Sequence, residues 1–433
     1  MVEELASSTP MGVGLRSPAP DGRASPAWLS RWALSNRQTF ALLALTLILF
    51  GGFVQALLIL NGDLAWLLTL DEKWLAGQRP YADLLEVNPP MSLLIYMPAV
   101  WISRIVNVQP QYIILAQVFA LICASTYLTS KILHDILGSE KFRLRFAAVT
   151  LFLFILFPWD VFGQRDHIAV IALFPFVALA IAHGRGLPPA KWLLILAGLG
   201  AGLAMCIKPH FALVVGMPML LNAVRTRSIR PLFGLETWIA SAVVIAYAAI
   251  VVALFPAYLG PYLDRVVTAY LRAPRRFTLI AASVLLAVTG SALVCLRLFN
   301  DRRALEWAAP WFAASLGGLG LFLAIGKWWS YSGYAMLVMA VAPILTSMTA
   351  GGDARPSSLK WTGRFLATAT ALCCMNWLAV GPQYAFLIKP VASVAPPHPK
   401  IITITYQITV GHPLVRELHG EWVGTSSAQI MAA

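Results

Sequence analysis

The segment TFALLALTLILFGGFVQALLIL, residues 39–60, decides the class of fold. It contains no charged residue and is long enough to cross the hydrocarbon core of a membrane as one helix. Further apolar runs lie at residues 91–106, 111–130, 146–158, 168–183, 192–207, 211–224, 235–255, 278–297, 307–325, 335–349 and 365–381. These runs are continuous rather than alternating, which predicts membrane helices and not a β-barrel.

The composition of the whole chain agrees with this reading. Of the 433 residues, 59% are hydrophobic and 12% are charged, whereas soluble proteins carry about twice that charged fraction. The net charge of +13 resides in short loops between apolar runs, which is typical of a membrane orientation signal and not of nucleic-acid binding. The five cysteines lie within apolar runs and lack metal-binding spacing, so neither a zinc site nor a disulfide framework is expected.

Three regions follow from these patterns. Residues 1–37 are rich in Ser, Pro, Gly and Arg, which predicts a disordered cytoplasmic tail. Residues 38–382 form the transmembrane domain, with a first outer loop at 61–90. Residues 383–433 form a short non-cytoplasmic segment with some β-structure, since β-branched residues nearly alternate over 401–410.

The distribution of basic residues predicts the topology. Run 91–106 is short, follows Pro89–Pro90 and contains Pro98, so we expect it to be re-entrant or interfacial. The basic loops at 131–145, 185–191, 225–230, 297–303 and 355–364 then all face the cytoplasm. The expected fold is an all-α polytopic membrane protein with about eleven transmembrane helices, plus re-entrant or juxtamembrane helices in the first outer loop. The polar loops share the outer face, at residues 61–90, 159–167, 208–210, 256–277, 326–334 and after 382.

The first outer loop is the strongest candidate for a functional segment. It carries four carboxylates in a chain that is otherwise mostly hydrophobic: Asp71, Glu72, Asp83 and Glu86. A carboxylate near the membrane surface can act as a general base or bind a divalent cation. The alternative is a solvated interfacial loop without a chemical role.

Three further outer-face groups carry charge. Arg165 suits a phosphate, whereas Asp166 and His167 suit metal binding or proton transfer; the alternative is a polar helix start. The remaining groups are Lys208 with His210, and Lys327 with Tyr331. Lysines there can bind an anion or simply extend to the interface.

The order of these motifs resembles the GT-C superfamily of membrane glycosyltransferases, which use polyprenyl-phosphate sugars. The resemblance covers roughly residues 38–335 and rests on the Asp-Glu pair at 71–72, the Gly-x-x-Pro-Tyr segment at 77–81 and the Asn-Pro-Pro at 88–90. Residues 163–167 are similar to a Gln-Arg-Glu-His stretch of uncharacterised bacterial members, with Asp166 in place of Glu. Val87 and Asn88 stand where aminoarabinose transferases often have an acid and a lysine, and Ser332 stands where His is expected.

The resemblance implies inverting transfer of a sugar from a polyprenyl-phosphate donor to a glycan, lipid or protein acceptor. The site would face the periplasm, in a bacterial inner membrane with the N-terminus cytoplasmic. Asp71 would be the general base, with Glu72 and Asp166 as further catalytic candidates. The expected donor-binding residues are Glu86, Arg165, His167, Lys208, His210, Lys327 and Tyr331.

A divalent cation such as Mg²⁺ or Mn²⁺ is optional in this scheme, with Asp71, Asp166 and His167 as its candidate ligands. Two other functions stay open from the sequence. One is a transporter or flippase of a lipid-linked saccharide without transfer activity, and the other is a structural subunit of an envelope polysaccharide assembly. The absence of P-loop, GxGxxG, HExxH and GxSxG motifs gives no support to ATP-driven, nicotinamide, zinc-protease or serine-hydrolase chemistry.

Overall fold

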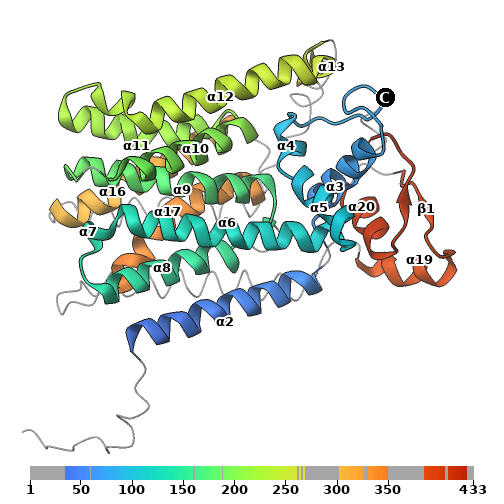
Figure 1. The fold of residues 1–433 in the computed structure, drawn as a ribbon, viewed down its shortest axis with the longest axis horizontal. Helices are drawn as coiled ribbons and strands as arrows, with labels where there is room; N and C mark the ends of the chain where they lie inside the picture. Colours follow the sequence, from blue (N-terminus) through green and yellow to red (C-terminus); the bar gives the residue numbers. More distant parts are fainter. Residues whose placement is uncertain are drawn as a thin grey trace, which may run out of the picture.

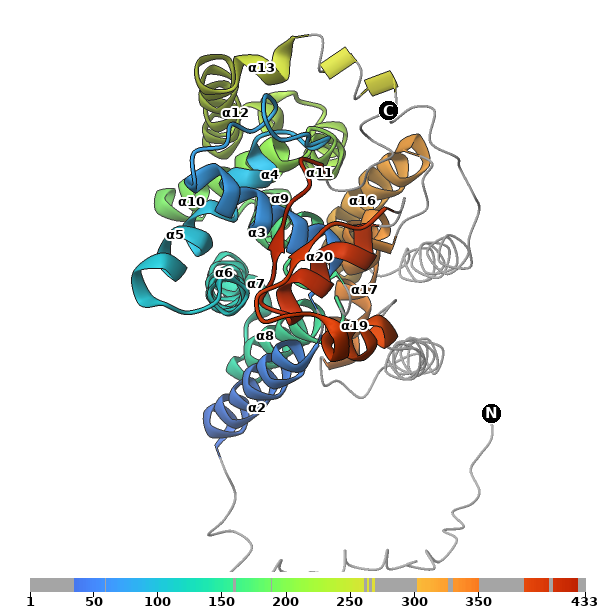
Figure 2. The same ribbon diagram turned by 90° about the vertical axis from the view of Figure 1, so that its right-hand side faces the viewer.

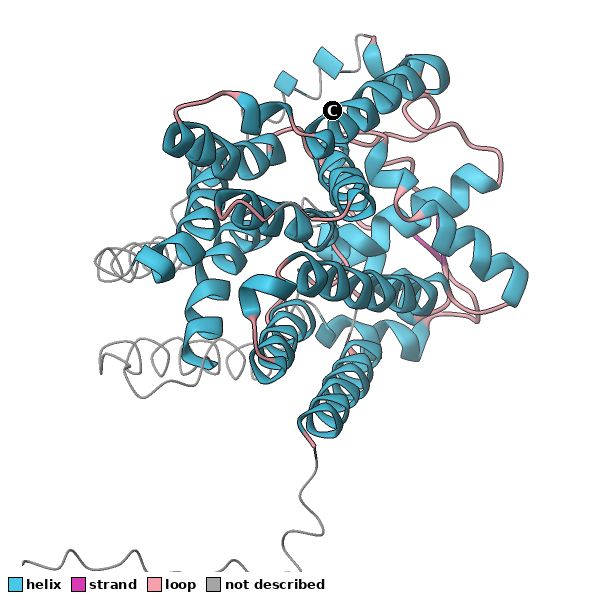
Figure 3. Ribbon diagram, turned by 60° about the vertical axis from the view of Figure 1, so that its left-hand side comes forward, coloured by secondary structure: helices cyan, strands magenta, loops and turns pink. Residues whose placement is uncertain are grey.

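The computed structural model describes residues 35–58, 60–158, 161–187, 189–260, 263–264, 267–268, 302–325, 330–349, 385–404 and 408–426. These parts are almost entirely helical, with one short two-stranded sheet (Figure 3). Four helices there are long and apolar enough to cross a membrane: α2 (Asn36–Leu57), α6 (Pro110–Ile132), α9 (Arg165–Gly184) and α12 (Leu235–Leu254). The expected all-α class is confirmed for these residues, and it includes helices with the length and hydropathy to cross a membrane. Tail residues 1–34 and runs 278–297 and 365–381 lie outside the described residues.

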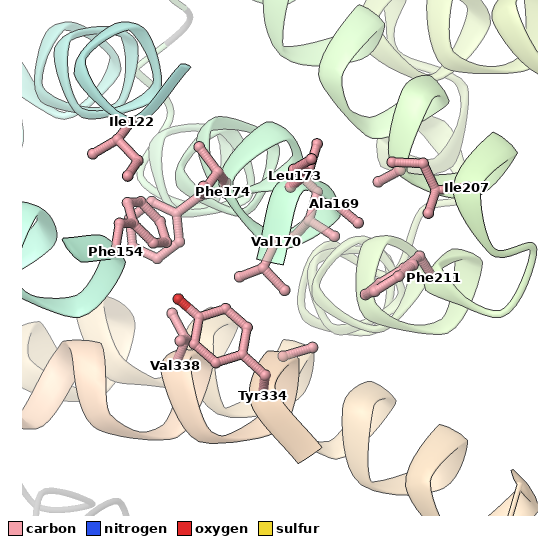
Figure 4. Packing of buried hydrophobic residues seen from close by; sticks show 14 of the residues in the cluster. Ile122, Phe154, Ala169, Val170, Leu173, Phe174, Ile207, Phe211, Tyr334 and Val338 are labelled. Atoms are coloured by element: carbon pink, nitrogen blue, oxygen red, sulfur yellow. The ribbon is translucent and has the colours of Figure 1, made fainter. Parts of the chain in front are cut away.

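Helix α9 forms the centre of the bundle, and 89% of its most apolar stretch is buried. It is apolar around its whole circumference, as a helix surrounded by other helices must be. Figure 4 shows Val170, Leu173 and Phe174 of α9 against Phe154 and Tyr334. The surrounding helices include α8 (Glu140–Ile155), α10 (Lys191–Ile207), α11 (Phe211–Thr226), α16 (Arg302–Ile325) and α17 (Ser330–Thr349) (Figure 1).

Side-chain caps fix where several of these helices begin. The Ser35 hydroxyl accepts from the Gln38 N–H at the start of α2, and the Ser139 hydroxyl accepts from the Phe142 N–H at the start of α8. Because α8 begins at Glu140, the basic residues expected in a loop at 131–145 are partly helical. Lys141, Arg143 and Arg145 lie in its first turns, and the short α7 (His134–Leu137) precedes it.

The first outer loop and the C-terminal segment cover one end of the bundle (Figures 1 and 2). The loop at residues 61–90 contains α3 (Gly62–Leu75), and run 91–106 directly after it contains α4 (Met91–Leu94) and α5 (Met97–Val106). The C-terminal segment contains η4 (Ala385–Leu387), α19 (Ile388–Val394), β1 (Lys400–Ile401), α20 (Ile408–Glu417) and β2 (Glu421–Trp422). Two further short helices are η2 (Arg230–Phe233) and α13 (Pro256–Leu259).

Run 91–106 has the broken form that its prolines indicate. It consists of α4 and α5, separated at Ile95 and Tyr96. The ten residues of α5 extend only about 15 Å, half the thickness of a bilayer core. Neither piece alone is long enough to cross.

The strand expected over residues 401–410 is short where that stretch is described. Lys400–Ile401 are in a strand, paired in parallel with Glu421–Trp422; residues 402–404 are not in a strand, and helix α20 begins at Ile408. The reason is packing: α20 buries Leu414 and Val415 and lies against α3. Burial of an apolar helix face overrides the β preference of a few branched residues.

Glycine allows α10 to approach α9 closely. A Cβ at Gly200 would lie 2.1 Å from the carbonyl oxygen of Ala172 on α9. A backbone oxygen at that distance cannot give way without moving a helix. Gly216 of α11 has no heavy atom within 4 Å of the corresponding position.

We expect Gly200→Ala to destabilise the protein by about 1–3 kcal/mol through overpacking. Gly216→Ala is the matched control and should stabilise it slightly, because alanine favours the helix by up to about 1 kcal/mol. Thermal unfolding of the purified protein in detergent measures both. Equal melting temperatures for the two variants would contradict the close approach of α9 and α10.

Candidate functional site

Helix α3 places Asp71 inside the bundle. Leu64, Leu67, Leu68 and Asp71 follow the i, i+3, i+4, i+7 spacing of one helix face, and all four are buried. Asp71 has an exposed fraction of 0%, and neither of its carboxylate oxygens has a hydrogen-bond partner among the described residues. Burial, reinforced by the charges of Glu72 and Glu86, raises the pKa of Asp71 well above its usual value. A buried carboxyl without partners is costly, and so marks a candidate functional group.

Glu86 organises the first outer loop from within. It is buried and accepts hydrogen bonds from the Trp66 indole and the Asn88 side chain, and from the Asn88 N–H at 2.7 Å. The Tyr81 hydroxyl then donates to the Asn88 carbonyl at 2.6 Å. Burial raises the pKa of Glu86 although nearby Arg165 and these hydrogen bonds oppose the shift.

Arg165 is the first residue of α9 and joins it to the first outer loop. Its guanidinium is buried; Nη1 donates to the Ser92 hydroxyl at 3.3 Å, and Nη2 lies 3.7 Å from the Asp63 carboxylate. The Tyr96 hydroxyl donates to the Gly163 carbonyl at 2.9 Å in the same region. Asp63, Ser92 and Tyr96 were not predicted. The Asn-Gly-Asp start of α3 is a sequence signal that could have indicated Asp63, since Asn61 caps that helix.

Asp166 and Lys208 form the second ion pair of the site. The Lys208 ammonium lies 2.6 Å from the Asp166 carboxylate and 4.8 Å from the centre of the Tyr331 ring. Burial lowers the pKa of Lys208, while the charge of Asp166 opposes that shift. The predicted grouping of residues 165–167, 208–210 and the start of α17 is therefore seen in their contacts.

His167 has a structural environment and not that of a ligand. The Gly163 N–H donates to its Nδ1 at 3.0 Å, so Nε2 carries the proton and donates to the Phe154 carbonyl at 2.9 Å. The ring is fully buried and leaves no nitrogen for a donor phosphate or a metal. His210 differs, because its Nε2 has no hydrogen-bond partner among the described residues, and burial lowers its pKa to about 4.

The candidate metal ligands do not form a metal centre in this geometry. Across the described parts of the chain, no three His, Cys, Asp or Glu side chains lie close enough to hold an ion. Lys208 already pairs with Asp166, and both nitrogens of His167 are used. Lys327 lies outside the described residues.

Glu72 faces away from Asp71 and holds the C-terminal segment. Its two carboxylate oxygens accept from the two terminal nitrogens of Arg416 at 2.7 and 2.8 Å. Arg416 also donates to the Thr69 hydroxyl at 3.0 Å. Adjacent residues on a helix point about 100° apart, so the Asp-Glu pair divides between the bundle and the C-terminal segment. This geometry gives Glu72 a structural role and not a catalytic one.

We call the inward-facing residues the polar cluster: Asp63, Asp71, Glu86, Tyr96, Arg165, Asp166, Lys208 and Tyr331. The Tyr96 hydroxyl lies within electrostatic reach of Arg165, Asp63, Asp166 and Asp71, which connects the cluster. Arg165 lies near Asp63, and Lys208 lies near Asp166. The Asp71 carboxylate has no hydrogen-bond partner among the described residues. Burial raises the pKa of both Asp71 and Glu86, and the charge of Arg165 opposes that shift at Glu86.

We expect Glu72→Gln and Arg416→Met to destabilise the protein non-additively. The bidentate pair is partly exposed, so a double-mutant cycle should give a coupling of about 1 kcal/mol. The exposed pair of Arg79 and Asp83, at 3.0 Å, is the matched control and should show no measurable coupling. Thermal unfolding of the full chain measures both cycles, and additive effects at Glu72 and Arg416 would contradict the docking role.

Comparison with protein-family models, with curated proteins and with solved structures finds no match to this chain. A function must therefore be inferred from the polar cluster and from the resemblance of its motifs.

Proposed function

We propose that the protein is a membrane glycosyltransferase that moves a sugar from a polyprenyl-phosphate donor to an acceptor hydroxyl. The observation that carries the proposal is Asp71, a fully buried carboxyl without a hydrogen-bond partner among the described residues. It belongs to the same cluster as Arg165 and Lys208, the two cations suited to a phosphate. A base and an anion site within one cluster are the two parts that this transfer needs.

Asp71 acts as the general base in this scheme. The acceptor hydroxyl attacks C1 of the donor sugar and passes its proton to a carboxylate oxygen of Asp71. The bond between C1 and the phosphate oxygen breaks, and polyprenyl phosphate leaves with the electron pair. A single displacement of this kind inverts the configuration at C1.

Arg165 and Lys208 stabilise the departing phosphate. Each has a carboxylate on one side, which fixes its position and leaves further N–H groups for the donor. Asp63 and Asp166 therefore act as positioning residues for these cations. His210 is neutral at ordinary pH and lies beside Lys208, where it can donate or accept a hydrogen bond. No step of this scheme is routed through a metal ion, and across the described residues no group of three potential ligands lies together.

The distribution of charge supports an outward-facing site. The Arg37–Glu140 pair at 2.6 Å and the Arg185–Glu306 pair at 3.8 Å lie at the end of the bundle away from the polar cluster. Basic residues concentrate on the cytoplasmic side of membrane proteins. We therefore place that end in the cytoplasm and the polar cluster in the periplasm of a bacterial inner membrane, with about eleven spans and a GT-C architecture for the whole chain.

A transporter or flippase is the alternative, and the placement of buried charge favours the enzyme. Among the described residues, Asp71, Glu86, Arg165 and Asp166 are buried at one end of the bundle and Glu236 at the other. A translocation path needs polar groups near the middle of the membrane. The central helix α9 is apolar from Ile168 to Ala182.

We expect Asp71→Asn to lower sugar transfer by about 10²- to 10⁴-fold, the usual contribution of a general base. Asp83→Asn is the matched control, because Asp83 lies in the same outer loop but is exposed and paired with Arg79. Transfer from a polyprenyl-phosphate sugar to membrane acceptors, measured with purified protein, is the test. Undiminished transfer by a folded Asp71→Asn protein would exclude Asp71 as the base.

The raised pKa of Asp71 also predicts a pH dependence of stability. The folded state favours the protonated carboxyl, so this stability is fully present below the unfolded-state pKa of about 4 and is lost as pH rises through the folded-state pKa. Asparagine cannot ionise. Asp71→Asn should therefore match the wild type in acid and be more stable than the wild type at higher pH. Melting temperatures measured across pH test this, and a difference independent of pH would contradict it.

A further inference from the structure

The turn before α9 places the two charged residues with which this helix begins, Arg165 and Asp166. Gln164 occupies the N-cap position, and its side chain makes no capping hydrogen bond to the described residues. The start of the helix must then be fixed by other contacts than the usual side-chain cap. The Gln164 N–H donates to the Val161 carbonyl at 3.0 Å, which closes the turn on itself. The position of the turn relative to the rest of the protein depends on its neighbours.

Gly163, within this turn, is held through both of its backbone groups. Its N–H donates to His167 Nδ1 at 3.0 Å, and its carbonyl accepts from the Tyr96 hydroxyl at 2.9 Å. Its φ of +74° lies in the left-handed region that favours glycine, and a Cβ there would lie 3.3 Å from the Leu64 side chain of α3. The turn is therefore held by α9 itself, by α3 and by Tyr96.

Tyr96 reaches the turn from the break between α4 and α5. Its side chain is fully buried, and a buried hydroxyl needs a hydrogen-bond partner, which the Gly163 carbonyl supplies. Burial raises the pKa of Tyr96, so the hydroxyl stays protonated and able to donate. Ser92, four residues earlier, accepts from Arg165 Nη1 at 3.3 Å. The broken segment thus contacts the start of α9 at two points.

The side-chain contacts of Arg165 are long. Nη1 lies 3.3 Å from the Ser92 hydroxyl, and Nη2 lies 3.7 Å from the Asp63 carboxylate. The Lys208 ammonium, by comparison, lies 2.6 Å from the Asp166 carboxylate. Strong hydrogen bonds between a cation and a carboxylate are about 2.7–2.9 Å long. The direction of the guanidinium therefore depends largely on where the turn places its backbone.

We propose that Tyr96 is a positioning residue, which directs Arg165 toward the phosphate of the polyprenyl-phosphate donor by holding the Gly163 turn. This inference rests on the proposed function, in which Arg165 stabilises the departing phosphate. Such stabilisation requires hydrogen-bond donors that are in place before the charge develops. The Tyr96 hydroxyl already donates to a backbone carbonyl and takes no part in the bonds that form and break.

The charge on the phosphate changes during the reaction, which separates this role from general destabilisation. The donor is a phosphodiester with one negative charge, whereas the polyprenyl phosphate that leaves carries about two at pH 7. A well-placed guanidinium therefore interacts most strongly once the bond from C1 to oxygen breaks. Loss of the Tyr96 hydroxyl should lower kcat and the affinity for the leaving group, and change the KM for the donor much less.

Tyr96→Phe in the full-length protein tests this role. We expect kcat for transfer from a polyprenyl-phosphate sugar to fall about tenfold, as the loss of one hydrogen bond implies. Affinity for undecaprenyl phosphate, measured by native mass spectrometry in phosphatidylcholine nanodiscs, should fall by a similar factor. Tyr334→Phe is the matched control, because its buried hydroxyl also donates to a backbone carbonyl, that of Leu153 on α8, at 3.0 Å. It should lower the melting temperature to a similar extent and leave kcat and binding unchanged.

A double-mutant cycle shows whether Tyr96 acts through Arg165. In an Arg165→Met protein, the addition of Tyr96→Phe should lower kcat and binding no further, and Arg165→Lys is a second background if the first does not fold. Wild-type kcat and binding in Tyr96→Phe, an undiminished effect of Tyr96→Phe without Arg165, or an equal loss of kcat in Tyr334→Phe would overturn the proposal.

The binding measurement needs no turnover, so the two proposals can fail separately. If no sugar is transferred but binding of undecaprenyl phosphate still depends on Tyr96 and Arg165, the proposed function fails and the positioning role remains. If the wild-type protein does not bind undecaprenyl phosphate, the positioning role fails. If transfer is normal in Tyr96→Phe, the positioning role fails and the proposed function remains.

Discussion

The arrangement of the polar cluster depends on one constraint. Charged side chains buried at the end of an apolar helical bundle must pair with opposite charges there. Arg165 and Lys208 enter from separate parts of the chain, and each meets a carboxylate, Asp63 and Asp166 respectively. Removing either partner would leave an uncompensated buried charge, which is far more costly than the pair itself. These two contacts therefore fix how the first outer loop, the start of α9 and the turn after α10 lie relative to each other.

Helix α3 serves two surfaces at once. Its inner face carries Asp71 among leucines, and its outer face carries Thr69 and Glu72, which hold Arg416. Arg104 adds hydrogen bonds to the carbonyls of Glu72 and Leu75 at the end of the helix, at 2.8 and 3.1 Å. A helix held on both faces and at its end has little freedom to turn. Arg104 and Arg416 thus help to set the orientation of Asp71 without contacting it.

The sequence predicted the helical class and the interruption of run 91–106, because each depends on local pattern. The shared face of the polar loops is seen only in contacts among described residues, such as Lys208 with Asp166. The role of His167 could not be predicted in the same way. Its two ring nitrogens contact the Gly163 N–H and the Phe154 carbonyl. Both partners are backbone groups, which every residue type has, so the sequence does not reveal these contacts. Asp63 was missed because an acid in a first helical turn is common. The helix at Ile408–Glu417 was missed because its burial against α3 depends on contacts distant in sequence.

The contact between Arg416 and Glu72 joins residues 344 positions apart. A chain inserted into a membrane as it is synthesised has placed α2 and α3 long before residues 408–426 exist. During that interval the C-terminal segment does not yet cover the outer face of α3, and Glu72 cannot yet pair with Arg416. The outer face of α3 is therefore covered by a docking step that follows the placement of α2 and α3 and that requires α20 to have been synthesised.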